Sequence, residues 1–132
     1  MPLAPSSDSG SGDVVEQVSV FLRSLEDLSA SFSKNTEALE AFALQQQTAQ
    51  LQQTFPKLLQ QLTETTTLEP AAHQRLRPYQ TEAHRRLRLL SVEAMKLRTV
   101  KQPETLEKVR SQLQDHLTQL TKFIQAIADE IA

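Results

Sequence analysis

The sequence predicts an all-α protein, an antiparallel helical bundle of about four helices. Over most of the 132 residues, apolar side chains recur at alternating steps of four and three, which is the spacing of one face of an α-helix. Glycine occurs only at Gly10 and Gly12, so the remaining chain lacks the residue on which tight hairpins and phosphate-binding loops depend. No segment shows the alternation of a β-strand, and β and α/β folds are therefore disfavoured.

The N-terminal part is predicted to be a disordered tail followed by the first helix. Residues 1–12 combine Pro, Ser, Gly and Asp and offer little to bury. Asp13 is the expected N-cap, with Glu16 three residues later as its capping-box partner. The helix carries one narrow apolar stripe, formed by Val14, Val18, Phe21, Leu25, Leu28 and Phe32. Residues 13–132 are predicted to form a single helical-bundle domain.

A second helix is predicted over residues 36–65. Its stripe begins with Leu39, Phe42 and Ala43 and continues in a slightly shifted register with Leu44, Leu51, Phe55, Leu58 and Leu62. Pro56 lies within it and removes a backbone donor, so we expect a kink or a break near residues 52–55.

Prolines open the last two predicted helices. Pro70 follows the threonine-rich turn at residues 65–67, and Pro103 follows the turn at residues 99–102. A second kink is expected near Pro78. The seam of the third helix consists of Leu76, Ala83, Leu87, Leu90, Ala94 and Leu97. The stripe of the fourth consists of Leu106, Val109, Leu113, Leu117, Leu120, Ile124, Ile127 and Ile131.

All four apolar stripes are narrow, so none of these helices is expected to be buried on all sides. Antiparallel packing of the four helices within one chain would close the stripes into a core. Pairing of two chains as a homodimer would also complete a core, and this alternative stays open.

The composition bears on localisation. There is no cysteine, which excludes disulfides and thiolate metal sites. The first residues show neither the basic region nor the apolar run of a secretory signal. No segment approaches the roughly 18 consecutive apolar residues that a membrane span needs. We therefore expect a cytoplasmic protein without a membrane span.

Residues that could carry chemistry are scattered. His73 and His84 are eleven residues apart, which is about 16 Å along a helix and too far for one metal ion. His116 lies on the next predicted helix. No nucleophile motif and no phosphate-binding loop is present. We expect neither an enzyme nor a bound metal or cofactor.

Charge is distributed unevenly along a chain whose formal net charge is −2. Residues 1–70 hold nine acids and three bases, residues 71–101 hold eight bases and two acids, and residues 102–132 hold three bases and five acids. The middle segment is therefore strongly basic between two acidic ones. Such a distribution can steer an acidic partner toward one face of the protein.

The basic segment contains the candidate binding site. On the side of the third helix opposite its seam lie Arg85, Arg88, Leu89, Val92, Met95 and Lys96. Apolar residues framed by bases are typical of a protein-binding surface. Alternatively, these residues pack under a neighbouring helix or a dimer mate, or are ordinary solvated helix formers. Nucleic acid is a less favoured partner, because the pI is about 5.9 and Tyr79 is the one aromatic residue of the segment.

Two motifs add a family resemblance. One is the run RRLRLL from Arg85 to Leu90, and the other is the tetrapeptide Gln102–Thr105 that opens the last helix. With them, residues 82–127 resemble the C-terminal half of the cyanobacterial PatD family, the heterocyst frequency control proteins. The resemblance covers about a third of the chain. It implies a small cytosolic regulator without enzymatic activity, which binds the tubulin-like division protein FtsZ and alters its assembly.

Three functions thus remain open from the sequence. The first is a regulator of a division protein, with FtsZ as the suspected partner. The second is a general helical adaptor or chaperone-like protein. The third, less favoured, is a nucleic-acid-binding regulator. FtsZ carries acidic and apolar segments, to which the face around Arg88 and Leu89 is chemically suited.

Overall fold

The computed structural model describes residues 4–34, 38–65 and 68–132, and it describes side chains within residues 14–31, 42–65 and 68–132. It contains four helices, α1 (Ala4–Lys34), α2 (Ala38–Glu64), α3 (Pro70–Thr99) and α4 (Pro103–Ile131), and these described residues include no strand. The predicted all-α fold is confirmed.

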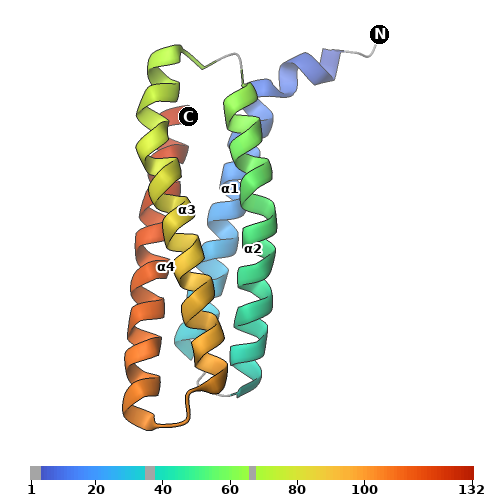
Figure 1. The fold of residues 1–132 in the computed structure, drawn as a ribbon. Coiled ribbons are helices and arrows are strands. Elements are labelled where there is room, and N and C mark those ends of the chain that lie inside the picture. Colours follow the sequence, from blue (N-terminus) through green and yellow to red (C-terminus); the bar gives the residue numbers. More distant parts are fainter. Residues whose placement is uncertain (1–3, 35–37, 66–67) are drawn as a thin grey trace.

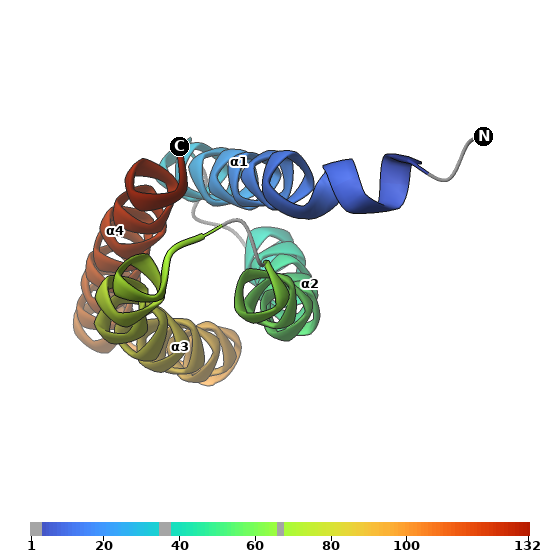
Figure 2. The same cartoon turned by 90° about the horizontal axis from the view of Figure 1, so that it is seen from above.

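The helices run alternately down and up, so each packs antiparallel to its two neighbours (Figure 1). Seen along the bundle they follow the ring order α1, α2, α3, α4 (Figure 2). The helices α3 and α4 form the most extensive pair, whereas α1 and α2 form the least extensive one. Helix α3 packs against both α4 and α2, and its side that faces away from the bundle is exposed.

The core is built from the predicted apolar stripes. In α1, Val14, Val18, Phe21, Leu25 and Leu28 are buried. The predicted seam of α3 is buried throughout, as is that of α4 from Val109 to Ile131, while Leu106 is partly exposed. Phe55 is fully buried at the centre, with its ring centroid 5.6 Å from that of Phe21. Phe32 and Leu39 lie outside the residues whose side chains are described.

The register at the start of α2 differs from the prediction. Phe42 and Ala43 are exposed, whereas Leu44 and Thr48 are buried. Phe42 precedes Leu44 by two residues, about 200° around the helix, so burying Leu44 turns Phe42 outward. Thr48 takes an apolar position in this register because its Oγ1 donates to the Leu44 carbonyl at 2.8 Å.

The first helix also begins earlier than predicted. It starts at Ala4, not at Asp13, and its first turns project beyond the bundle (Figure 1). Proline is tolerated in a first turn, and each glycine costs a helix only about 1 kcal/mol, so neither Pro5 nor Gly10 ends it. Residues 1–3 of the predicted tail lie outside the described residues.

The two internal prolines lie within continuous helices. Pro56 is inside α2 and Pro78 inside α3, and both are exposed. Each proline removes the hydrogen bond to the carbonyl four residues earlier, at Gln52 and Gln74 respectively. Since α2 continues through residues 52–55, the alternative of a break there is wrong. A solvent-facing position lets water replace the missing donor.

Candidate functional site

The six residues of the predicted binding site lie on one side of α3. Arg85, Arg88, Val92, Met95 and Lys96 are exposed, and Leu89 is half-buried. They are flanked on the inner side by the buried Ala83, Leu87, Leu90, Ala94 and Leu97. We call the six residues the outer α3 face. None of them belongs to the core of this chain.

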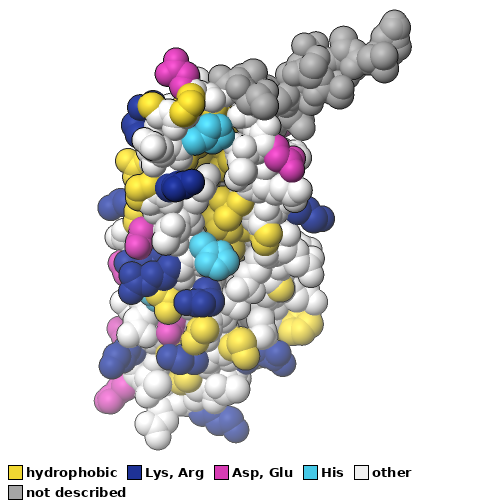
Figure 3. Space-filling model, turned by 45° about the horizontal axis from the view of Figure 1, so that its top comes forward, with side chains coloured by type: hydrophobic (Ala, Val, Ile, Leu, Met, Phe, Trp, Pro, Cys, Tyr) yellow, Lys and Arg dark blue, Asp and Glu magenta, His cyan; other side chains and the backbone are white. Residues whose placement is uncertain are grey.

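Two apolar side chains of the outer α3 face are unusually open to solvent. Met95 is 56% exposed and Val92 is 43% exposed. Figure 3 shows Lys and Arg side chains gathered over the α3 side of the molecule with hydrophobic surface among them. Exposed apolar side chains inside a charged rim are the arrangement found in protein–protein interfaces.

Two of the three bases of the outer α3 face, Arg85 and Arg88, have weak ion pairs or none among the described residues. Arg85 Nη1 lies 3.8 Å from Glu82, and Lys96 Nζ lies 3.2 Å from Glu93 Oε2. The Arg85 pair joins two solvent-accessible side chains and contributes about 0–1 kcal/mol, whereas Lys96 donates to the buried Glu93. Arg88 forms no ion pair with any residue that the structure describes. The charges of Arg85 and Arg88 therefore remain available to an acidic partner.

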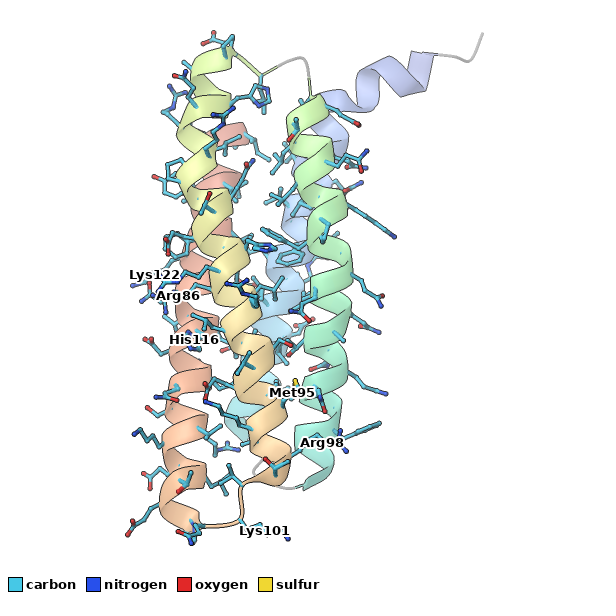
Figure 4. The ribbon with its side chains drawn as sticks, viewed as in Figure 1. Arg86, Met95, Arg98, Lys101, His116 and Lys122 are labelled. Atoms are coloured by element: carbon cyan, nitrogen blue, oxygen red, sulfur yellow. The ribbon has the colours of Figure 1, made fainter. Side chains whose placement is uncertain are left out.

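A second feature adjoins the outer α3 face at the edge between α2 and α3. The Arg98 guanidinium lies over the ring of Phe42, 5.7 Å from its centroid, and Arg98 Nη1 donates to Gln45 Oε1 at 2.9 Å. Figure 4 shows Met95 and Arg98 on the side of α3 next to α2. Sequence reasoning missed this pair because it assigned Phe42 to the core. The shift of register between Phe42 and Leu44 was the signal available.

Nearer the middle of the bundle, α2 and α3 line a small open cavity of about 90 Å³. It is lined by Gln52, Phe55, Pro56, His84, Leu87 and Arg88. The exposed His84 stacks on Phe55 with ring centroids 6.2 Å apart and an interplanar angle of 26°. This stacking gives His84 a structural role beside the core, and the cavity is too small for a sizeable ligand.

On the other side of α3, a polar cluster joins α3 to α4. Arg86 Nη1 lies 3.1 Å from His116 Nδ1 and 3.9 Å from Asp115 (Figure 4 labels Arg86 and His116). Arginine can only donate, so His116 Nδ1 accepts and its proton resides on Nε2. Glu93 is buried nearby, and its Oε1 has no hydrogen-bond partner among the described residues.

The surroundings of His116 disfavour its charged form. Burial lowers the pKa of His116 below its usual value of 6.5, and the positive charges of Arg86 and, more weakly, Arg85 lower this pKa further. The carboxylates of Glu93 and Asp115 oppose the shift without reversing it. A neutral His116 is a hydrogen-bond acceptor that holds Arg86 against α4.

The weakly paired helices α1 and α2 leave a groove of about 380 Å³ between them. Its lining combines core side chains with polar ones: Gln17, Val20, Phe21, Ser24, Asp27, Leu28, Gln47, Gln50, Leu51, Thr54 and Leu58. The hydroxyls of Ser24 and Thr54 donate to the carbonyls four residues earlier in their own helices. The groove is apart from the basic segment and nearly uncharged.

The arrangement of titratable groups offers no metal centre in the part of the chain that the structure describes. Among those residues, no three His, Asp or Glu side chains come together in a way that could hold an ion. None of the described helices is long and apolar enough to cross a membrane.

Fold and surface together define a four-helix bundle with a basic and apolar face exposed on α3. Comparison of the chain with known protein families, with curated proteins and with solved structures finds no match. The function must therefore be inferred from the surface itself.

Proposed function

We propose that this chain is a non-enzymatic regulatory protein that binds an acidic, partly apolar segment of a partner protein through the outer α3 face. The proposal rests chiefly on one observation, the exposure of Val92 and Met95 beside the weakly paired Arg85 and Arg88. Interface energy concentrates in a few apolar and arginine anchors, and this face offers both.

FtsZ is the candidate partner that the resemblance to the PatD family suggests. Binding would modulate FtsZ assembly in the cytoplasm and, through it, the frequency of heterocysts. Charge complementarity supports this choice, because residues 71–101 carry eight bases and two acids and FtsZ carries acidic segments. A general adaptor or chaperone role would use the same face with less selectivity.

The test is a double charge reversal, Arg85→Glu with Arg88→Glu. We expect it to weaken binding to purified FtsZ at least tenfold, which corresponds to about 1.4 kcal/mol. Affinity would be measured by fluorescence anisotropy with labelled FtsZ, and circular dichroism would verify that each variant is folded.

The matched control is Arg23→Glu with Lys57→Glu, which changes the net charge equally but on exposed positions of α1 and α2. The neutral surface pair Gln46→Ala and Gln50→Ala serves as a second control. Both controls should bind within about twofold of the parent, well below a tenfold effect. A folded double reversal that binds as tightly as the parent would exclude the outer α3 face as the site.

Two further outcomes separate the alternatives. If the parent protein does not bind FtsZ, the partner assignment is wrong. If it binds duplex DNA with an affinity that collapses as salt rises, the nucleic-acid alternative gains support at the expense of the proposal.

A further inference from the structure

The edge between α2 and α3 holds an arginine that is oriented before any partner arrives. The ring of Phe42 supports one face of the Arg98 guanidinium at 5.7 Å, and Gln45 Oε1 accepts one of its N–H groups at 2.9 Å. Both contacts come from α2, whereas Arg98 belongs to α3. The guanidinium is therefore restrained from two directions across a helix–helix boundary.

This arginine still has donors to offer. A guanidinium carries five N–H groups, and one of them serves Gln45. No carboxylate of the described residues forms an ion pair with Arg98. An exposed arginine normally loses much side-chain freedom when it binds, and here part of that loss has already occurred. The planar fork suits a carboxylate, which it can bind through two parallel hydrogen bonds.

Apolar surface lies directly beside it. Phe42 is 50% exposed and Met95 is 56% exposed, so a partner carboxylate at Arg98 would have apolar side chains next to it. We infer that Phe42, Met95 and Arg98 form a preorganised anchor for an acidic side chain that is adjacent to an apolar one in the partner segment. The inference rests on the proposed function and extends its site from α3 onto α2.

The spacing of the two arginines describes the segment further. Arg88 and Arg98 are ten residues apart on α3, which is about 15 Å along the helix axis, and Val92 and Met95 lie between them. An extended segment covers this distance in about four to five residues. The partner segment should therefore carry acids at both ends and apolar residues in the middle.

The probe is a fluorescein-labelled peptide of the sequence Glu-Glu-Leu-Pro-Leu-Glu-Glu, in which proline favours an extended backbone. We expect it to bind the parent protein, and a peptide with the same composition but all four glutamates at one end to bind at least fivefold more weakly. Equal affinity of the two peptides, or no binding by either, would overturn the inference.

The variants are Arg98→Lys, Phe42→Ala and their combination. Arg98→Lys retains the charge and loses the planar fork, so a fivefold or greater weakening would separate orientation from charge. The combination should weaken binding little more than either single change, because the two side chains act as a unit. If charge attraction alone held the peptide, Arg98→Lys would bind it with the affinity of the parent protein.

Val20→Ala and Arg23→Lys are the matched controls, since both positions are exposed on α1. Neither should change peptide affinity by more than about twofold, a change smaller than the effect sought. Urea unfolding of each variant measures its free energy of unfolding. This measurement separates a role in binding from the alternative in which Phe42 and Arg98 only hold α2 against α3. In that case stability would fall while affinity stayed at the parent value, and the inference would be wrong.

The two proposals fail in different ways. If Arg85→Glu with Arg88→Glu abolishes FtsZ binding while Arg98→Lys and Phe42→Ala leave both FtsZ and peptide binding intact, the anchor is refuted and the proposed function survives. If the protein binds the peptide but not FtsZ, and Phe42→Ala weakens peptide binding, the anchor is supported and the assignment of FtsZ as partner is wrong.

Discussion

At the scale of single residues, the contact between Arg86 and His116 makes the α3–α4 pairing sensitive to protonation. His116 accepts the hydrogen bond through Nδ1, so a protonated ring would present a donor to a donor and place two positive charges 3.1 Å apart. Asp115 and Glu93 face the same cluster and only partly offset this repulsion. The folded protein therefore favours the neutral form of His116.

We predict that the free energy of unfolding decreases as the pH falls below about 6.5 and that His116 is responsible for part of the decrease. Because the pKa of His116 is lowered in the folded state, the unfolded chain binds more protons in this range, and acid favours unfolding. Urea titrations of the parent and of His116→Gln at about pH 7.5 and pH 5.5 measure the effect. The parent should lose more stability between the two pH values than the variant. Equal losses would show that His116 does not couple to folding.

At the scale of the helices, α3 and α4 form the most extensive pair, and both contribute fully buried side chains to the core. Leu117 and Leu120 of α4 are fully buried, whereas Leu89 of α3 is half-buried. The same residue type thus occupies positions that contribute to stability by different amounts. The difference follows from which side of its helix each leucine occupies.

We predict that Leu117→Ala and Leu120→Ala each lower the free energy of unfolding by about 2–5 kcal/mol. Leu89→Ala should lower it by less than about 1 kcal/mol, because partner atoms surround only part of that side chain. Denaturant unfolding followed by circular dichroism compares the three variants directly. A loss below about 0.5 kcal/mol for the α4 variants would mean that this stripe is not in the core.

At the scale of the whole molecule, the four helices close one core, and the start of α1 lies beyond it. The buried residues of α1 begin at Val14 among the side chains that the structure describes. The first turns of α1 project past the neighbouring helices (Figure 1), and the core residues described in α1 all lie from Val14 onward.

We predict that deleting residues 1–12 leaves a cooperatively folding domain of residues 13–132. Its free energy of unfolding should stay within about 0.5 kcal/mol of the parent value, since the deletion leaves all the described core residues of α1 in place. Thermal unfolding monitored at 222 nm (a helix signal) would show one transition in both proteins. A lower midpoint, or a second transition, would mean that the start of α1 contributes to the fold.

The apolar periodicity of the sequence sufficed to predict four helices, their antiparallel packing and most of the core, because a stripe with helical spacing must be buried against another stripe. It also located the outer α3 face, since residues opposite a buried seam face solvent. The register at the start of α2 was not predicted correctly. Phe42 and Leu44 each fit an apolar stripe, and only packing against the other helices decides which of them is buried. Contacts such as those of Arg98 with Phe42 and of Arg86 with His116 join residues far apart in sequence. The tertiary structure alone brought them together, because no local pattern encodes which side chains meet across two helices.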